Sequence, residues 1–235
     1  MNVHLSIDFD YFCYEDPAWD WGHQESPMFK TEIWAARYST SHFDLTEEVT
    51  INKADFPPKF LPKLLQEKGL QFGKECIFTI ADSHRLAKTA LTPKADALLS
   101  FDAHIDYYPI QEYGDCSNWM RSVEKQYKHI TNIIPKWSEE KDYLHRPRQG
   151  KMFYWADLPQ QEGEITRIFI AKSSAWTPPH MDRYFDELLV AFSEALPKSR
   201  SIEWHNDTAN RWTPAMQKAA KDREQFLAKL SQMVK

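Results

Sequence analysis

The fold is decided by the stretch Ser100-Phe101-Asp102-Ala103-His104-Ile105-Asp106-Tyr107. Asp102, His104 and Asp106 alternate with apolar residues, so on a β-strand their side chains would leave the same face. Asp and His are common metal ligands, and three of them on one face predict a metal site at the end of a strand. Taken alone, the stretch fits an exposed edge strand or a loop equally well.

Two other segments strengthen the metal prediction. Apolar and polar residues alternate over residues 3–10, which predicts a strand with Asp8 and Asp10 near its end. Carboxylates at the end of a buried parallel strand are costly unless a cation meets them. The β-rich run at 76–80 leads to His84, in a loop position where binding residues commonly lie. A lone histidine there is more often an ordinary loop residue.

Together the three segments supply four carboxylates and two imidazoles. Histidine binds metals as the neutral imidazole, so one divalent ion would leave two negative charges uncompensated and two ions would balance all four. With no thiolate in the set, the ligands suit two Mn²⁺ ions better than structural zinc, although zinc and iron stay open. Two ions about 3.5–4 Å apart would lower the pKa of a water between them. The predicted ligands are Asp8, Asp10, His84, Asp102, His104 and Asp106.

The motifs resemble those of a known family. Asp102-Ala103-His104-Ile105-Asp106 resembles the DAHxD motif of the arginase and agmatinase ureohydrolases, and Ser6-Ile7-Asp8-Phe9-Asp10 resembles their SxDxD motif. Ser83-His84 corresponds to the Asp-His of the family's GGDHS segment. The resemblance implies that one manganese is held by His84, Asp102, Asp106 and Asp8, and the other by Asp102, His104, Asp8 and Asp10.

The chain also departs from the familiar ureohydrolases. Their SxDxD motif comes last, whereas here it begins the chain, and Ala81-Asp82 replaces their glycine pair. At 235 residues the chain is shorter than usual. These features look more like compact arginase-like proteins that include peptide arginases, which convert arginine to ornithine within a ribosomally made peptide and release urea. The resemblance therefore implies a hydrolase of linear amidines whose partner is an arginine-containing peptide. A small-molecule arginase or agmatinase stays open as the alternative.

Candidate catalytic and substrate-binding residues follow from this resemblance and from their positions. Asp106 can hold a metal and hydrogen-bond its water, which makes it the candidate proton shuttle, with His104 as the other catalytic residue. Four residues are candidate substrate contacts, and each has a plain structural alternative such as helix capping or an ordinary surface position. They are Asn118, Ser174, Trp176 and Glu203.

The succession of elements predicts an α/β fold. Helix-forming residues 85–91 lie between the His84 segment and the apolar run at 95–101, and a β-like run at 165–170 precedes an amphipathic helix at 179–196. We expect a three-layer αβα domain with a mostly parallel sheet, arginase/deacetylase-like, with the site at the carboxyl ends of its strands. Residues 136–163 are expected to form a polar connecting excursion. The length favours a single domain spanning 1–235.

Composition narrows the environment and the partners. A net charge of −5 gives no case for nucleic acid. No apolar run approaches the length of a membrane span, and no basic and then apolar leader opens the chain. Cys13, Cys76 and Cys116 lack metal spacing and cannot all pair within the chain, so we expect reduced thiols in the cytoplasm. The oligomeric state is left open.

Three other functions fit parts of the pattern. A deacetylase-like amidohydrolase would use a single zinc held by Asp, His and Asp, and the additional ligands speak against it. A two-metal phosphoesterase fits the ligand types, but the sequence has no Gly-rich phosphate cradle or basic cluster around the motifs. A binding protein with a vestigial site predicts missing ligands, whereas all six are present.

Overall fold

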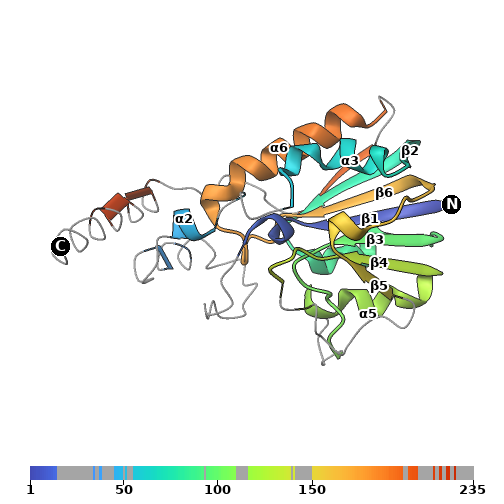
Figure 1. The fold of residues 1–235 in the computed structure, drawn as a ribbon, viewed down its shortest axis with the longest axis horizontal. Coiled ribbons are helices and arrows are strands. Elements are labelled where there is room, and N and C mark those ends of the chain that lie inside the picture. The colour runs from blue at the N-terminus through green and yellow to red at the C-terminus, as the bar shows by residue number, and fades with distance from the viewer. Residues whose placement is uncertain are drawn as a thin grey trace.

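The computed structural model contains one seven-stranded sheet in which every pair of neighbouring strands is parallel. The strand order is β5-β4-β3-β1-β6-β2-β7 (Figure 1). The strands are β1 (Asn2–Asp8), β2 (Leu70–Ala81), β3 (Ala97–Phe101), β4 (His129–Ile133), β5 (Gly150–Phe153), β6 (Gly163–Ala171) and β7 (Ser201–His205). The structure describes residues 1–14, 34, 37–38, 45–49, 51, 55–92, 94–109, 116–138, 140, 150–197, 201–205, 214, 217–218, 221–222 and 225.

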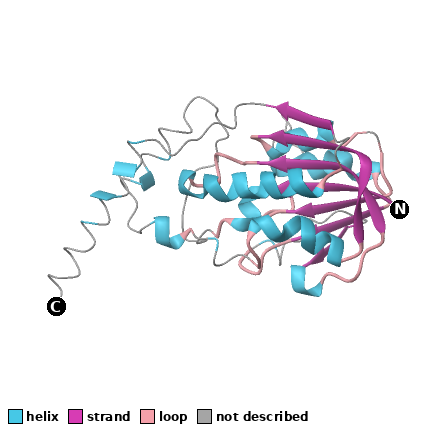
Figure 2. Ribbon diagram, turned by 90° about the horizontal axis from the view of Figure 1, so that it is seen from above, coloured by secondary structure: helices cyan, strands magenta, loops and turns pink. Residues whose placement is uncertain are grey.

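Helices cover both faces of this sheet, and the strand arrows all point one way (Figure 2). The α-helices are α2 (Leu45–Glu48), α3 (Leu61–Glu67), α4 (Ala87–Ala90), α5 (Trp119–Val123) and α6 (Asp182–Ala195). Short 3-10 helices join them: η1 (Phe9–Phe12), η3 (Pro58–Phe60), η4 (His84–Leu86), η5 (Cys116–Asn118), η6 (Glu124–Gln126), η8 (Trp155–Asp157) and η9 (Pro179–Met181). The predicted α/β class with three layers and a parallel sheet is confirmed.

Alternation along β1 separates the two sides of the sheet. Val3, Leu5 and Ile7 pack into a large core with α3 and α6, as their spacing of two residues requires. The intervening polar residues face the second core, which α4 and α5 cover. Thus the polar positions of β1 lie inside the molecule, and each of them needs a partner.

Helix α6 shows why the amphipathic pattern at 179–196 was a reliable signal. Phe185, Leu188 and Phe192 recur at helical spacing and are buried against the sheet. The ring of Phe185 meets that of Phe9 edge to face, with centroids 5.2 Å apart. Val190 of the same helix is 56% exposed.

Three local expectations were wrong. Strand β3 ends at Phe101, so Asp102, His104 and Asp106 do not alternate along a strand but lie in the loop after it. Strand β1 ends at Asp8, whose carboxylate caps η1 by accepting a hydrogen bond from the Asp10 amide. Asp10 therefore lies in η1 and not on the strand. The excursion expected at 136–163 contains the edge strand β5.

Strand register brings the predicted segments together. Ile7 of β1 pairs with Phe101 of β3, and Asp8 pairs with Ala171 of β6. Ala81 of β2 pairs with the same Ala171. The carboxyl ends of four central strands therefore lie level with one another, and the loops that follow them converge at one edge of the sheet.

The two sides of α6 give a stability test. Phe185→Ala should lower the free energy of unfolding by about 3–5 kcal/mol, because it removes a fully buried ring and leaves a cavity. Val190→Ala on the same helix should change it by no more than about 0.5 kcal/mol. Chemical denaturation followed by circular dichroism measures both, and equal losses for the two variants would contradict the placement of α6.

Candidate metal centre

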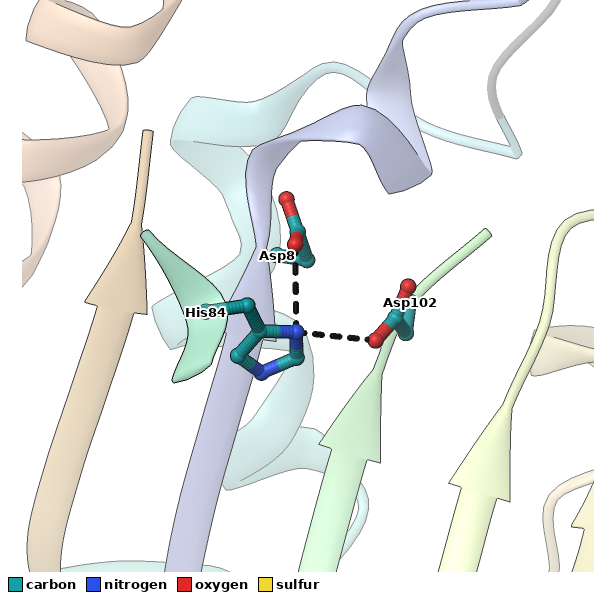
Figure 3. Close-up of side chains that lie close together, drawn as sticks. All are labelled: Asp8, His84 and Asp102. Carbon is teal, nitrogen blue, oxygen red and sulfur yellow. Dashed lines mark ion pairs between the residues drawn. The ribbon is translucent and has the colours of Figure 1, made fainter. Parts of the chain in front are cut away.

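Three side chains from three different strand ends meet at the centre of this edge (Figure 3). Nδ1 of His84 lies 3.1 Å from Oδ2 of Asp8 and 3.0 Å from Oδ2 of Asp102. Oδ2 of Asp106 lies 3.1 Å from the same nitrogen. One imidazole nitrogen thus faces three carboxylate oxygens, which is how ligand atoms are arranged around a bound metal ion.

Contacts on the side of the ring away from the carboxylates fix the orientation of His84. Its Nε2 lies 2.8 Å from the Ser6 hydroxyl, and its ring lies parallel to that of Phe169 and 4.7 Å from that of Trp119. If Nε2 donates to Ser6, Nδ1 keeps its lone pair for a metal. Although it is fully buried, Nδ1 makes no well-oriented hydrogen bond to any of the three carboxylates. A buried polar atom without such a bond calls for another partner, and a cation fits.

A second cluster shares Asp102 with the first. Asp10, Asp102 and His104 bring one ligand atom each close enough to hold a second ion. Nδ1 of His104 lies 3.1 Å from Oδ2 of Asp10 and 3.8 Å from Oδ1 of Asp102. The two oxygens of Asp102 therefore face different histidines, Oδ2 towards His84 and Oδ1 towards His104. This is the arrangement expected of a carboxylate that bridges two metals.

Neighbouring groups hold the ligands in place. The Ser173 hydroxyl donates to Oδ2 of Asp8 at 2.6 Å, and Nε1 of Trp119 donates to Oδ2 of Asp106 at 2.7 Å. Asp106 and Ser173 have φ angles of 47° and 49°, in the left-handed region that non-glycine residues seldom adopt. Such strain persists where the surrounding structure demands it, and functional sites are a common place for it.

Electrostatics in the metal-free protein favour bound protons. Burial raises the pKa of Asp8 and Asp102, and neighbouring carboxylates raise it further: Asp10 for Asp8, and Asp106 and Asp10 for Asp102. For His84 burial lowers the pKa, but the charges of Asp102 and Asp8 outweigh it and hold the pKa well above its usual value. The pKa of His104 is raised in the same way by Asp10 and Asp102. A divalent cation would replace these protons.

The residues fit a dinuclear metal site. Each of the four aspartates is 6% exposed or less. Within the described part of the chain, only histidines form ion pairs with them, so no lysine or arginine offsets their charge. Oxygen and imidazole ligands without thiolate suit Mn²⁺, and the geometry leaves Zn²⁺ and Fe²⁺ compatible. All six sequence-predicted ligands are brought together.

The four predicted substrate contacts differ in their burial and in their position relative to the candidate metal centre. Trp176 is half-buried, and its ring centroid lies 6.4 Å from that of His104, whose side chain is 45% exposed. Ser174 is buried in the same turn, where its carbonyl accepts from Nε1 of Trp34. Asn118 is buried at the N-cap of α5 but makes no capping hydrogen bond with its side chain. Glu203 lies in β7 opposite Thr79, and the orientation of its side chain is outside the described structure.

Sequence reasoning missed the residues that support the ligands. Ser6, Ser173 and Trp119 were not singled out for this role, and the first of them lay inside the SxDxD motif. The polar alternation of β1 could have indicated Ser6, because a buried hydroxyl on the ligand face needs a partner. No local signal identified the other two.

No protein-family model matches the chain, and comparison with curated proteins and with solved structures gives no match either. The site therefore has to be interpreted from its own geometry. Among the residues described, no helix combines the length and apolar character needed to cross a bilayer.

Metal binding should become more stabilising as pH rises. All four pKa shifts mean that the metal-free folded protein holds more protons than the unfolded chain, so its stability falls as pH rises above the ordinary values of 3.8 for Asp and 6.5 for His. Saturating Mn²⁺ should therefore raise the Tm more at about pH 8.5 than at about pH 6. Thermal melts with EDTA and with Mn²⁺ measure this, and an equal or smaller gain at the higher pH would contradict it.

Ser6→Ala should weaken manganese binding about 10- to 100-fold, because it removes the group that orients His84 and fixes its tautomer. Ser122→Ala, which changes an exposed serine of α5, should leave the affinity unchanged. Calorimetric titration of EDTA-treated protein gives both values. Equal affinities would show that the contact with Ser6 does not position the ligand.

Proposed function

We propose that this chain is a dinuclear manganese hydrolase that converts arginine to ornithine within a peptide and releases urea. One observation carries the proposal: two clusters of carboxylate and imidazole ligands share Asp102 at the carboxyl ends of the central strands. With two metals bound, such a site supplies a water of lowered pKa and positive charge to stabilise a tetrahedral intermediate. None of the three cysteines forms a disulfide, which agrees with a reducing compartment, and we propose that the protein acts in the cytoplasm.

Charge favours a guanidinium substrate. The four aspartates form an acidic centre, and within the described residues no lysine or arginine pairs with them. Two divalent ions would balance these four charges, and deprotonation of the water between them would leave one negative charge, which favours a cationic side chain over a phosphate ester. The second cluster around Asp10 and His104 also disfavours the single-zinc deacetylase chemistry.

Two residues take the proposed catalytic roles. Hydrolysis joins a water oxygen to the guanidinium carbon and breaks the bond from that carbon to the side-chain nitrogen of the future ornithine. Asp106 lies beside the ligand cluster, where it would accept the proton of the water and pass it to the leaving amine. His104 would bind a metal on the more exposed side of the centre, where its half-accessible ring can also contact the substrate.

The substrate would approach from the side of His104. Trp176 lies next to that imidazole and offers a flat ring on which a guanidinium plane can stack. Asn118 and Ser174 are both buried at this edge of the sheet, and their roles would be to shape the site and orient the substrate. Glu203 remains a proposed contact for the cation.

Metal content and urea release together test the proposal. Manganese-loaded protein should contain two ions per chain and release urea from arginine-containing peptides, with ornithine detected in the peptide by mass spectrometry. Free arginine and agmatine, incubated separately, should release little urea. Urea from either small molecule instead would assign a small-molecule ureohydrolase, and two metals without urea from any substrate would overturn the guanidino chemistry.

A matched pair of variants ties the activity to the shared ligand. Asp102→Asn should lower urea release by more than about a hundredfold, beyond the loss expected from removing a supporting group, and should reduce the metal content below two ions. Asp96→Asn changes a surface carboxylate that pairs with Lys128 and should leave both unchanged. If both variants keep their activity, the proposed centre is not the active site.

A further inference from the structure

An open cavity lies near the amino ends of the strands, away from the metal centre. Its volume is about 770 Å³. The start of β1, residues 71–77 of β2, Lys94 and the first half of β6 form its walls. Its position leaves it unexplained by the proposed hydrolysis.

Irregular strand pairing opens this cavity. Phe72 of β2 pairs with Ile165 of β6 and Ile77 pairs with Arg167, so four residues of β2 lie opposite Thr166 alone. The pairing of β1 with β6 also shifts at this point, because Val3 pairs with Ile165 and His4 with Arg167. Bulges of this kind redirect side chains and are often found beside functional sites.

Three basic side chains line the cavity: Lys74, Lys94 and Arg167. Two of them, Lys94 and Arg167, are not paired with acids among the described residues. Arg167 is half-buried, and its Nη1 donates to the Ala90 carbonyl at 3.2 Å. The remaining guanidinium donors suit two oxygens of one anionic group, because arginine binds carboxylate and phosphate in a bidentate manner.

The other ionisable side chains that line the cavity limit the charge of the ligand it can bind. Burial and the charge of Arg167 lower the pKa of His4 to about 4, and burial raises that of Cys76 to about 12, so both are neutral near pH 7. Glu75 and Glu164 are exposed members of the lining. Their charges would repel a polyanion such as nucleic acid but leave room for a small ligand with one anionic group.

Distance separates this cavity from the metals. Arg167 lies four residues before the end of β6, and His4 lies four residues before the metal ligand Asp8. At a rise of about 3.3 Å per residue the two regions are about 13 Å apart. A small ligand bound at Arg167 would therefore not reach the metal centre.

We propose that this cavity is a second binding site, for a small molecule that presents one carboxylate or one phosphate group to Arg167 and Lys94. The two basic residues hold the anionic group, and the polar walls formed by Gln71 and Thr166 accommodate the rest of the molecule. The proposal does not depend on the hydrolase function.

Calorimetric titrations with inorganic phosphate and with acetate, at constant ionic strength, test the site and distinguish the two anions. At least one of them should bind, and Arg167→Gln should weaken its binding about tenfold or more, as loss of a charge-assisted hydrogen bond implies. Arg183→Gln removes an exposed arginine from α6 and should leave the affinity unchanged. If Arg167→Gln does not fold, Lys94→Gln should show the same weakening.

The same titrations can overturn the proposal. Failure of both anions to bind would do so, as would equal binding by the wild type and Arg167→Gln, or by the wild type and Lys94→Gln where that variant is used. Phosphate can also bind metals, so His84→Asn is titrated as well. Binding that is lost in His84→Asn but kept in Arg167→Gln would place the anion at the metal centre instead.

Discussion

The repulsion among four buried aspartates is the constraint on which this structure depends. Two like unit charges 4 Å apart interact by about 4 kcal/mol at the effective dielectric typical of proteins, and the whole fold is expected to be stable by only about 5–15 kcal/mol. Asp8, Asp10, Asp102 and Asp106 are nevertheless held within one small volume. Protons can relieve the repulsion in the metal-free protein, whereas bound divalent cations would relieve it at neutral pH.

The parallel sheet makes this concentration of charge possible. The candidate ligands come from the end of β1 and from the segments after β1, β2 and β3, whose carboxyl ends are held level by their register. Support comes from a fourth strand end and from a helix, because Ser173 follows β6 and Trp119 begins α5. The site is therefore built from elements that are distant in sequence, and only the completed sheet brings them together.

The sequence was sufficient to predict which candidate ligands the fold brings together, but not their local geometry. Hydrophobic periodicity indicated β1, β6 and α6, and the residue types near strand ends indicated the metal. Alternation was then extended too far: Asp10 lies in the 3-10 helix that Asp8 caps, and the loop after Phe101 turns through a left-handed Asp106. In both turns an aspartate accepts a hydrogen bond from the amide two residues on, Asp8 from Asp10 and Asp102 from His104. Aspartate at a strand end is therefore a local turn signal that competes with the alternating pattern. The edge strand β5 was missed because it is short and only partly buried.

The polar face of β1 links the two candidate sites. Asp8 at one end faces the candidate metal centre, Ser6 in the middle contacts His84, and His4 lies in the wall of the cavity that Arg167 also lines. The sheet thus presents excess negative charge at its carboxyl edge and Arg167 near the other. About 13 Å of strand separates the two groups of charges, which is too far for one small ligand to contact both. Each region can therefore select a ligand of opposite charge, and one folded strand serves both.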